Sequence, residues 1–89
     1  MAKLLYSDAF IEDITEVELA SKRDEIFERV DLLADFPDLG SLNVPDSIRL
    51  RFGDSVRKLV GSPFDVLYEY DRASESVFIL GLVHQRAAF

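Results

Sequence analysis

The spacing of apolar side chains changes once along this sequence, and that change constrains the fold more than any other feature. Within residues 8–35 apolar residues recur at every third or fourth position, which is the period of an amphipathic helix. From residue 48 onward they alternate with polar residues, which is the period of a strand with one buried face. The sequence therefore predicts helices in its first half and a β-sheet in its second half.

The first half is predicted to hold a short strand and two helices. The apolar run at residues 3–6 predicts an edge strand, and Ser7 is a good N-cap for the helix that follows it. The second helix is predicted to begin near Ser21, because SKRD places an acid three residues after the serine, as in a capping box. The proline and glycine in FPDLGS, residues 36–41, end this helix. The two helices are predicted to form an antiparallel hairpin.

Turn signals divide the second half into four predicted strands. IRLRF and SVRKLV flank a Gly-Asp link at residues 53–54, a kind of link that joins the strands of hairpins. Residues 61–63 and 71–76 give the next two turns. The predicted fold class is α+β, as a single domain of residues 1–89. It has an N-terminal strand, an α-helical hairpin and a four-stranded antiparallel β-meander with the helices on one face.

Composition and charge narrow the functional classes. The net charge of −7 argues against non-specific attraction to nucleic acid. This charge is uneven, because residues 1–46 hold 12 acids and 4 bases whereas residues 47–89 hold 5 acids and 6 bases. An anionic partner is therefore expected to meet the second half. The chain has no cysteine, which excludes thiol catalysis. No apolar run approaches the roughly 20 residues of a membrane span, so we expect a cytoplasmic protein without membrane contact.

Basic side chains gather around the predicted hairpin at residues 53–54. With a two-residue loop, Arg49 would face Lys58 directly across the ladder, and Arg51 would lie on the same face. Like charges that face each other cost stability, so this pair could hold an anion. The alternative is that both side chains splay into solvent or pair with acids such as Asp65.

The last predicted strand, VFILGLVH, ends on the only histidine of the chain. Without a bulge, Phe78, Leu80, Leu82, His84 and Arg86 would point the same way, with the last two at the exit of the strand. Histidine exchanges protons near neutral pH and arginine binds phosphate through a planar fork, so the pair suits phosphodiester chemistry. The alternative is a structural histidine. No phosphate-binding loop and no second histidine is present, so we expect neither a metal nor another cofactor.

Three segments together resemble the RelE/ParE superfamily of small bacterial toxins: FPDLGS, VRKLVGSPFDVLYEYD and the terminal VFILGLVHQR. The resemblance covers nearly the whole chain. It implies the toxin of a type II toxin–antitoxin system, which a cognate antitoxin wraps and neutralises. The ParE-like branch inhibits DNA gyrase, whereas the RelE-like branch cleaves messenger RNA on the ribosome.

The resemblance also implies roles for single residues. Lys58 and Arg86 match basic positions that RelE-like nucleases use on the scissile phosphate, and His84 could transfer the proton. Asp65 stands where such nucleases have a further arginine. LVHQR is closer to the ParE-like pattern, so gyrase inhibition is favoured.

Two alternatives stay open, a metal-independent RelE-like endoribonuclease and a non-toxic relative that keeps only antitoxin binding. The candidate catalytic residues, for a ribonuclease alone, are Lys58, His84 and Arg86. The candidate residues for binding a substrate or partner are Arg49, Arg51 and Arg57. The sequence leaves the oligomeric state open.

Overall fold

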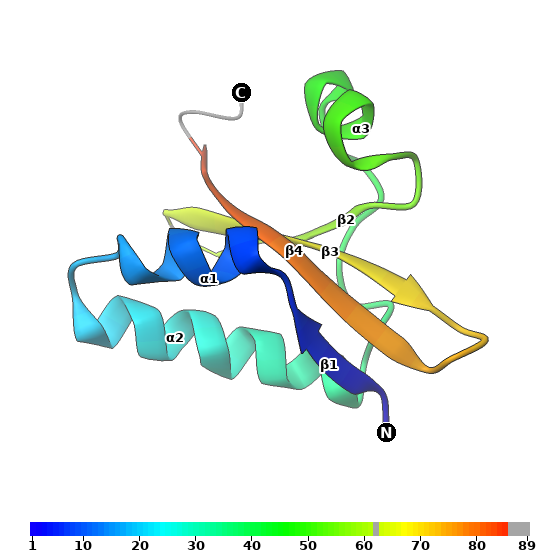
Figure 1. Ribbon diagram of the computed structural model, residues 1–89, viewed down its shortest axis with the longest axis horizontal. Coiled ribbons are helices and arrows are strands. Elements are labelled where there is room, and N and C mark those ends of the chain that lie inside the picture. Colours follow the sequence, from blue (N-terminus) through cyan, green and yellow to red (C-terminus); the bar gives the residue numbers. More distant parts are fainter. Residues whose placement is uncertain (62, 86–89) are drawn as a thin grey trace.

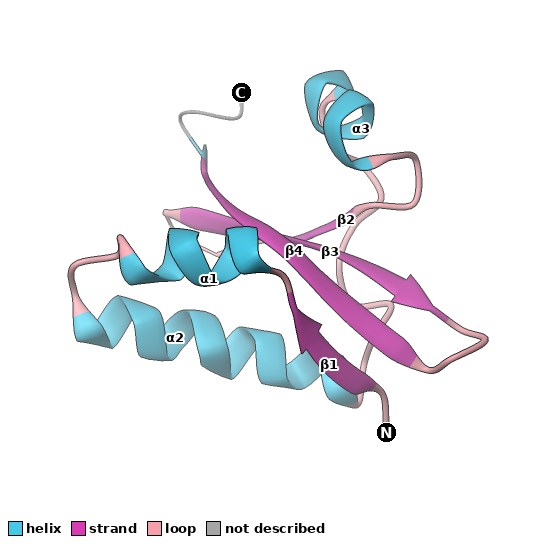
Figure 2. Cartoon of the chain, in the orientation of Figure 1, coloured by secondary structure: helices cyan, strands magenta, loops and turns pink. Residues whose placement is uncertain are grey.

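The computed structural model describes residues 1–61 and 63–85. Its elements in chain order are β1 (Lys3–Tyr6), α1 (Asp8–Thr15), α2 (Ala20–Asp31), the 3₁₀ turn η1 (Leu32–Ala34), α3 (Asp46–Phe52), β2 (Arg57–Leu59), β3 (Phe64–Asp71) and β4 (Ser76–His84). Figures 1 and 2 show α1 and α2 side by side, with α3 standing apart from both. The predicted α+β class is confirmed.

The sheet has the strand order β1-β4-β3-β2, so the edge position predicted for residues 3–6 is confirmed. β4 pairs with β3, and β3 with β2, in antiparallel orientation, whereas β1 pairs with β4 in parallel. The predicted C-terminal antiparallel meander is present, but it has three strands instead of four, because residues 48–52 are helical. The parallel β1 makes the whole sheet mixed. Parallel neighbouring strands need a long crossover connection. Along the sequence, the segment that runs from α1 to β3 connects β1 to β4.

The helical hairpin covers one face of the sheet, as predicted. The main core holds apolar side chains from α1, α2 and η1 packed on the strands, and its fully buried members are Phe10, Val30, Leu33, Tyr68, Val77 and Ile79. A second cluster lies on the opposite face, where α3 contributes Ile48 and Phe52. The prediction for the hairpin is thus confirmed, and the additional helix α3, which was predicted as a strand, covers the other face.

The two helix starts differ from each other in how well the sequence predicted them. Ser7 caps α1 as predicted, because its Oγ accepts a hydrogen bond from the Phe10 N–H at 3.0 Å. The predicted cap at Ser21 is wrong, since α2 already begins at Ala20 and its N-cap, Leu19, makes no side-chain hydrogen bond. The helix was predicted to end at FPDLGS, but α2 already ends at Asp31 and η1 at Ala34, so the helical segment stops before that sequence.

Residues 48–52, predicted as a strand, belong to helix α3. In IRLRF the first and last apolar residues, Ile48 and Phe52, are four positions apart, so they also share one face of a helix. Val44 and Ile48 are buried in the second cluster with Leu67. Gly53 ends the helix with φ of 100°, a conformation in which glycine is not strained. A hairpin around residues 53–54 is thus replaced by a helix end.

A bulge in β4 decides where its side chains point. Leu67 pairs with Gly81 and Tyr68 pairs with Ile79, so Leu80 is an extra residue on β4. Leu80 then packs in the second cluster, whereas Leu82 lies in the main core. The prediction that Leu80 and Leu82 point the same way is therefore wrong, because the bulge exchanges the two faces.

α1 holds this bulge in place. The Asp13 Oδ2 atom accepts a hydrogen bond from the Leu82 N–H at 3.1 Å. The Ser7 hydroxyl donates to the Leu80 carbonyl at 2.9 Å. Side chains of the N-cap and of α1 thus satisfy backbone groups of β4 that lie beyond its last pair with β1, Tyr6 with Ile79.

Tyr68 anchors the FPDLGS loop to the sheet. Its ring is fully buried, and its hydroxyl accepts from the Gly40 N–H at 2.7 Å and donates to the Pro37 carbonyl at 2.9 Å. A Cβ atom at Gly40 would lie 2.6 Å from the Tyr68 Cε1 atom. The loop can therefore approach the ring this closely only with glycine at that position.

We expect Tyr68→Phe to lower the free energy of unfolding by about 1–3 kcal/mol, because the buried Gly40 N–H and Pro37 carbonyl both lose their partner. Urea denaturation measures this change. Tyr70→Phe, on the same face of β3 but only half-buried, is the control, and its expected change is below about 0.5 kcal/mol. Equal losses for the two variants would contradict this account of the loop.

Candidate functional site

Among the predicted site residues, Lys58 of β2 lies on the same side of the sheet as Arg49 and Arg51 of α3. Lys58 is half-buried and pairs with Leu67 across the ladder. Directly opposed residues share a face, and Leu67 packs with α3 in the second cluster. The Lys58 side chain therefore leaves the sheet on the side that carries α3. We call this side the α3 face.

Both arginines of α3 have contacts within their own segment. The Arg49 Nη1 atom lies 3.2 Å from the Asp46 Oδ1 atom, and its Nη2 donates to the Leu42 carbonyl at 3.4 Å. The Arg51 guanidinium lies 5.0 Å from the centre of the Phe52 ring. The predicted ladder pair of Arg49 and Lys58 is wrong, because residues 48–52 are helical and do not pair with β2.

Asp65 adds a carboxylate to the α3 face. It lies two residues before Leu67 in β3, so the two side chains share a face of the sheet, and Asp65 is only 3% exposed. Its Oδ1 atom accepts a hydrogen bond from the Gln85 Nε2 at 3.0 Å, and the same nitrogen donates to the Gly61 carbonyl at 2.6 Å. Asp65 therefore places a carboxyl group on the same face of the sheet as Lys58.

His84 lies on the opposite face of the sheet from Lys58. Its ring meets the Phe64 ring edge-on, with centroids 5.2 Å apart and planes at 85°. It lines a pocket of about 270 Å³ together with two acids, Asp13 and Glu16, and with apolar side chains of the main core. The bulge places His84 there, beyond Leu82. Arg86, the predicted partner of His84, lies outside the described residues.

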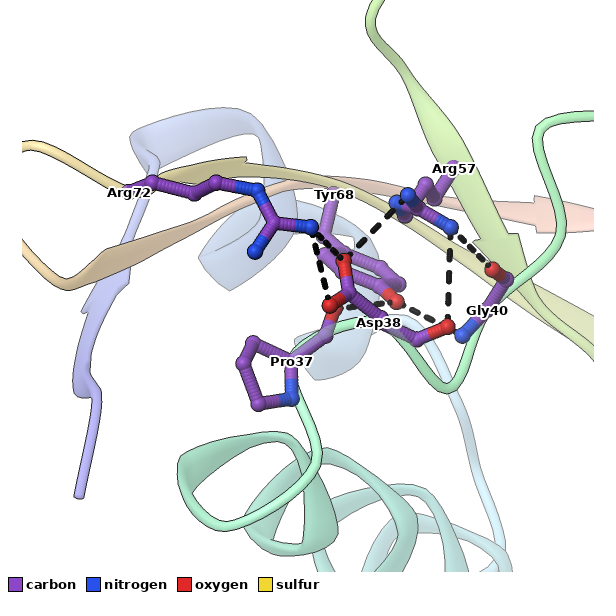
Figure 3. Close-up of polar contacts among 6 residues, drawn as sticks. All are labelled: Pro37, Asp38, Gly40, Arg57, Tyr68 and Arg72. Atoms are coloured by element: carbon purple, nitrogen blue, oxygen red, sulfur yellow. Dashed lines mark hydrogen bonds and ion pairs between the residues drawn. The ribbon is translucent and has the colours of Figure 1, made fainter.

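Arg57 is bound to the FPDLGS loop (Figure 3). Its Nη2 lies 3.3 Å from Asp38 Oδ1, and its Nη1 donates to the Gly40 carbonyl at 2.8 Å. The other Asp38 oxygen lies 3.0 Å from Arg72 Nη2, so one carboxylate joins two arginines. Sequence analysis missed Asp38 and Arg72, because an ion pair across 34 positions leaves no local pattern.

Two tyrosines have pKa values above the ordinary one, and neither supplies a phenolate near neutral pH. Burial raises the pKa of Tyr68, although the hydrogen bond from Gly40 and the charge of Arg57 act in the opposite direction. Burial also raises the pKa of Tyr6, and the nearby negative charge of Asp31 adds to the effect.

The described residues contain no group of three or more His, Asp or Glu side chains placed to hold a metal ion. Within residues 1–61 and 63–85, no helix is both long and apolar enough to cross a membrane.

The predicted site residues that the structure describes do not form one cluster. Lys58, Arg49 and Arg51 belong to the α3 face, whereas His84 lies on the opposite face and Arg57 holds a loop.

No protein-family model and no curated protein matches this sequence. Solved structures do match its fold. A chain of the toxin–antitoxin complex RelBE2 from Mycobacterium tuberculosis superimposes with a TM-score of 0.73 and 14% identity, over 93% of this chain and 96% of that chain. The isolated RelE toxin from E. coli gives 0.71 and 10%, over 94% and 84%. A chain of the intact E. coli RelBE complex gives 0.67 and 13%, over 94% and 96%. The chain has the RelE fold.

The RelE fold confirms the predicted resemblance at the level of architecture. The ParE-like preference drawn from LVHQR stays a prediction, because the matches concern the fold. Within the RelE fold of this chain, the α3 face is the candidate functional surface, since it combines Lys58 with both arginines of α3.

The hydrogen bond between Asp65 and Gln85 is expected to stabilise the α3 face. We expect Gln85→Ala to lower the free energy of unfolding by about 1–3 kcal/mol, because the buried Asp65 carboxylate loses its donor. Urea denaturation of the wild type, Gln85→Ala, Asp65→Ala and the double variant gives the coupling energy. The double variant should lose less than the sum of the single variants. Simple additivity would mean that the pair does not interact.

Proposed function

We propose that this chain is the toxin of a type II toxin–antitoxin system and that it acts in the cytoplasm by binding a protein target, without catalysing a reaction. DNA gyrase is the proposed target, because LVHQR resembles the ParE-like pattern. A cognate antitoxin is the second proposed partner. The RelE fold supports the toxin assignment, since two of the matched structures are complexes of a RelE toxin with its antitoxin.

The proposal that the chain acts without catalysis rests on one observation: Lys58 and His84 lie on opposite faces of the sheet. Cleavage of a phosphodiester needs its acid and base within hydrogen-bond reach of the same reacting group. The two candidates project from opposite faces of one sheet, and Asp65 places a carboxylate on the face of Lys58. A scissile phosphate gathers negative charge in the transition state, which a neighbouring carboxylate opposes.

The charge of the chain supports the same proposal. Its net charge is −7, so contact with ribosomal RNA would work against long-range repulsion. A protein target needs only local complementarity, which a limited basic surface can provide.

A RelE-like, ribosome-dependent endoribonuclease is the second candidate. It is favoured by one observation, that the matched solved structures include the isolated RelE toxin and RelBE complexes. Under this candidate Lys58 and Arg86 would contact messenger RNA and His84 would transfer protons.

Expression from a tightly regulated promoter tests the toxin assignment, and co-expression of any small protein found to be encoded beside the gene of this chain tests the antitoxin. Growth should stop without the neighbour and resume with it. Inhibition of DNA supercoiling by purified gyrase, together with unchanged messenger RNA ends, identifies the proposed mode. New transcript ends would favour the ribonuclease, and a chain that binds the antitoxin but never arrests growth would be a non-toxic relative.

Substitutions separate the two modes directly. We expect Lys58→Ala and His84→Ala to keep growth arrest within about threefold of the wild type, because neither residue performs chemistry. A nuclease that loses its general acid or base would lose about 10²–10⁴-fold in cleavage rate. Lys22→Ala on α2 is the control for removal of a lysine, and circular dichroism checks that each variant folds. Loss of arrest in both site variants, with the control active, contradicts the binding mode.

A further inference from the structure

Helix α3 exposes a leucine that the fold does not use. Ile48 and Phe52 face the second cluster, and Leu50 lies on the other side of the helix with 89% of its surface exposed. Among the large apolar side chains that the structure describes, only Met1 is more exposed. Transfer of this side chain from water into an apolar pocket of a partner would be favourable.

Two arginines flank this leucine, and contacts restrict both of them. Asp46 and the Leu42 carbonyl hold the Arg49 guanidinium. The Arg51 guanidinium packs on the Phe52 ring. Side chains restricted in advance lose less entropy when they bind. The helix dipole favours cations at a helix C-terminus, which accounts for the arginines but not for an apolar side chain between them.

The surroundings indicate the charge of a partner. Residues 1–46 hold 12 acids and 4 bases, so the helical hairpin is acidic. An acidic partner would be repelled by α1 and α2 and attracted to α3, which Figure 1 shows apart from them. Nucleic acid would use the arginines alone, because phosphates offer no apolar pocket for leucine.

The shape indicates that the partner is already folded. A segment that folds on binding needs a groove or strand edge along which to order. α3 has only seven residues and presents one apolar side chain at its surface. A single apolar side chain between charges is compatible with a small apolar pocket that has a polar, solvent-accessible rim.

We propose that α3 is a docking element that inserts Leu50 into an apolar pocket with an acidic rim on a folded partner protein. Arg49 and Arg51 contact the rim. The inference rests on the proposed function and assigns this contact to the target of the toxin. The antitoxin would then bind the chain elsewhere.

Four variants test the proposal: Leu50→Glu, Arg51→Glu, the conservative Leu50→Met, and Leu19→Glu as a control at a leucine that is 62% exposed at the start of α2. Growth arrest is measured on expression in cells. Binding of the purified variants to the antitoxin is measured by calorimetry, and circular dichroism confirms that they fold.

Leu50→Glu should abolish growth arrest, and Arg51→Glu should weaken it, while antitoxin affinity stays within about threefold for both. Leu50→Met and Leu19→Glu should remain toxic. With purified DNA gyrase as the probe, Leu50→Glu should weaken binding at least about tenfold, the size expected for a central anchor. The affinity of the wild type should fall as salt is raised.

A toxic Leu50→Glu variant overturns this inference and leaves the proposed function intact. Loss of antitoxin binding with toxicity retained also overturns it, because α3 would then contact the antitoxin. Arrest that needs Leu50 without any binding to gyrase supports the docking element and removes gyrase as the target. A wild-type chain that never arrests growth overturns the proposed function and this inference together.

Discussion

The hydrogen bonds between α1 and the bulge of β4 fix the arrangement on which the rest of the structure depends. β4 lies inside the sheet, between β1 and β3, so its side chains contribute to both faces. Asp13 and Ser7 satisfy the backbone groups of Leu82 and Leu80 at the extra residue. Leu82 thereby enters the main core, and His84 follows it to the side of the helical hairpin. A regular strand would have placed Leu80 and Leu82 on one face.

The division of charges follows from this architecture. Lys58 leaves β2 toward α3, Arg57 holds the FPDLGS loop through Asp38, and His84 lies beside acids of α1. A set of basic residues that looks concentrated along the sequence is thus distributed over two faces and a loop. This distribution suits recognition of a protein better than chemistry on a phosphodiester, because catalysis needs these groups at one point.

The contacts that hold the FPDLGS loop differ from those of α3 in how much of the side chains they bury. Tyr68 and Asp38 tie the loop after η1 to β2 and β3, and these contacts are buried or paired. α3 contributes two apolar side chains to the second cluster, Ile48 and Phe52, and leaves Leu50 in solvent. An element with a small share of the core can change its outer surface at little cost in folding energy.

The sequence by itself determined the elements whose apolar spacing extends over several turns or whole strands. These are the two long helices, the cap at Ser7, the edge strand and the strands β3 and β4. It could not decide residues 48–52, because five residues with alternating apolar positions also place Ile48 and Phe52 four apart. Only the tertiary structure decided that segment, through the second cluster on the open face of the sheet. It also decided the direction of His84, since the bulge is held by a carboxylate 69 positions away from Leu82. Local spacing carries no information about contacts made at that separation.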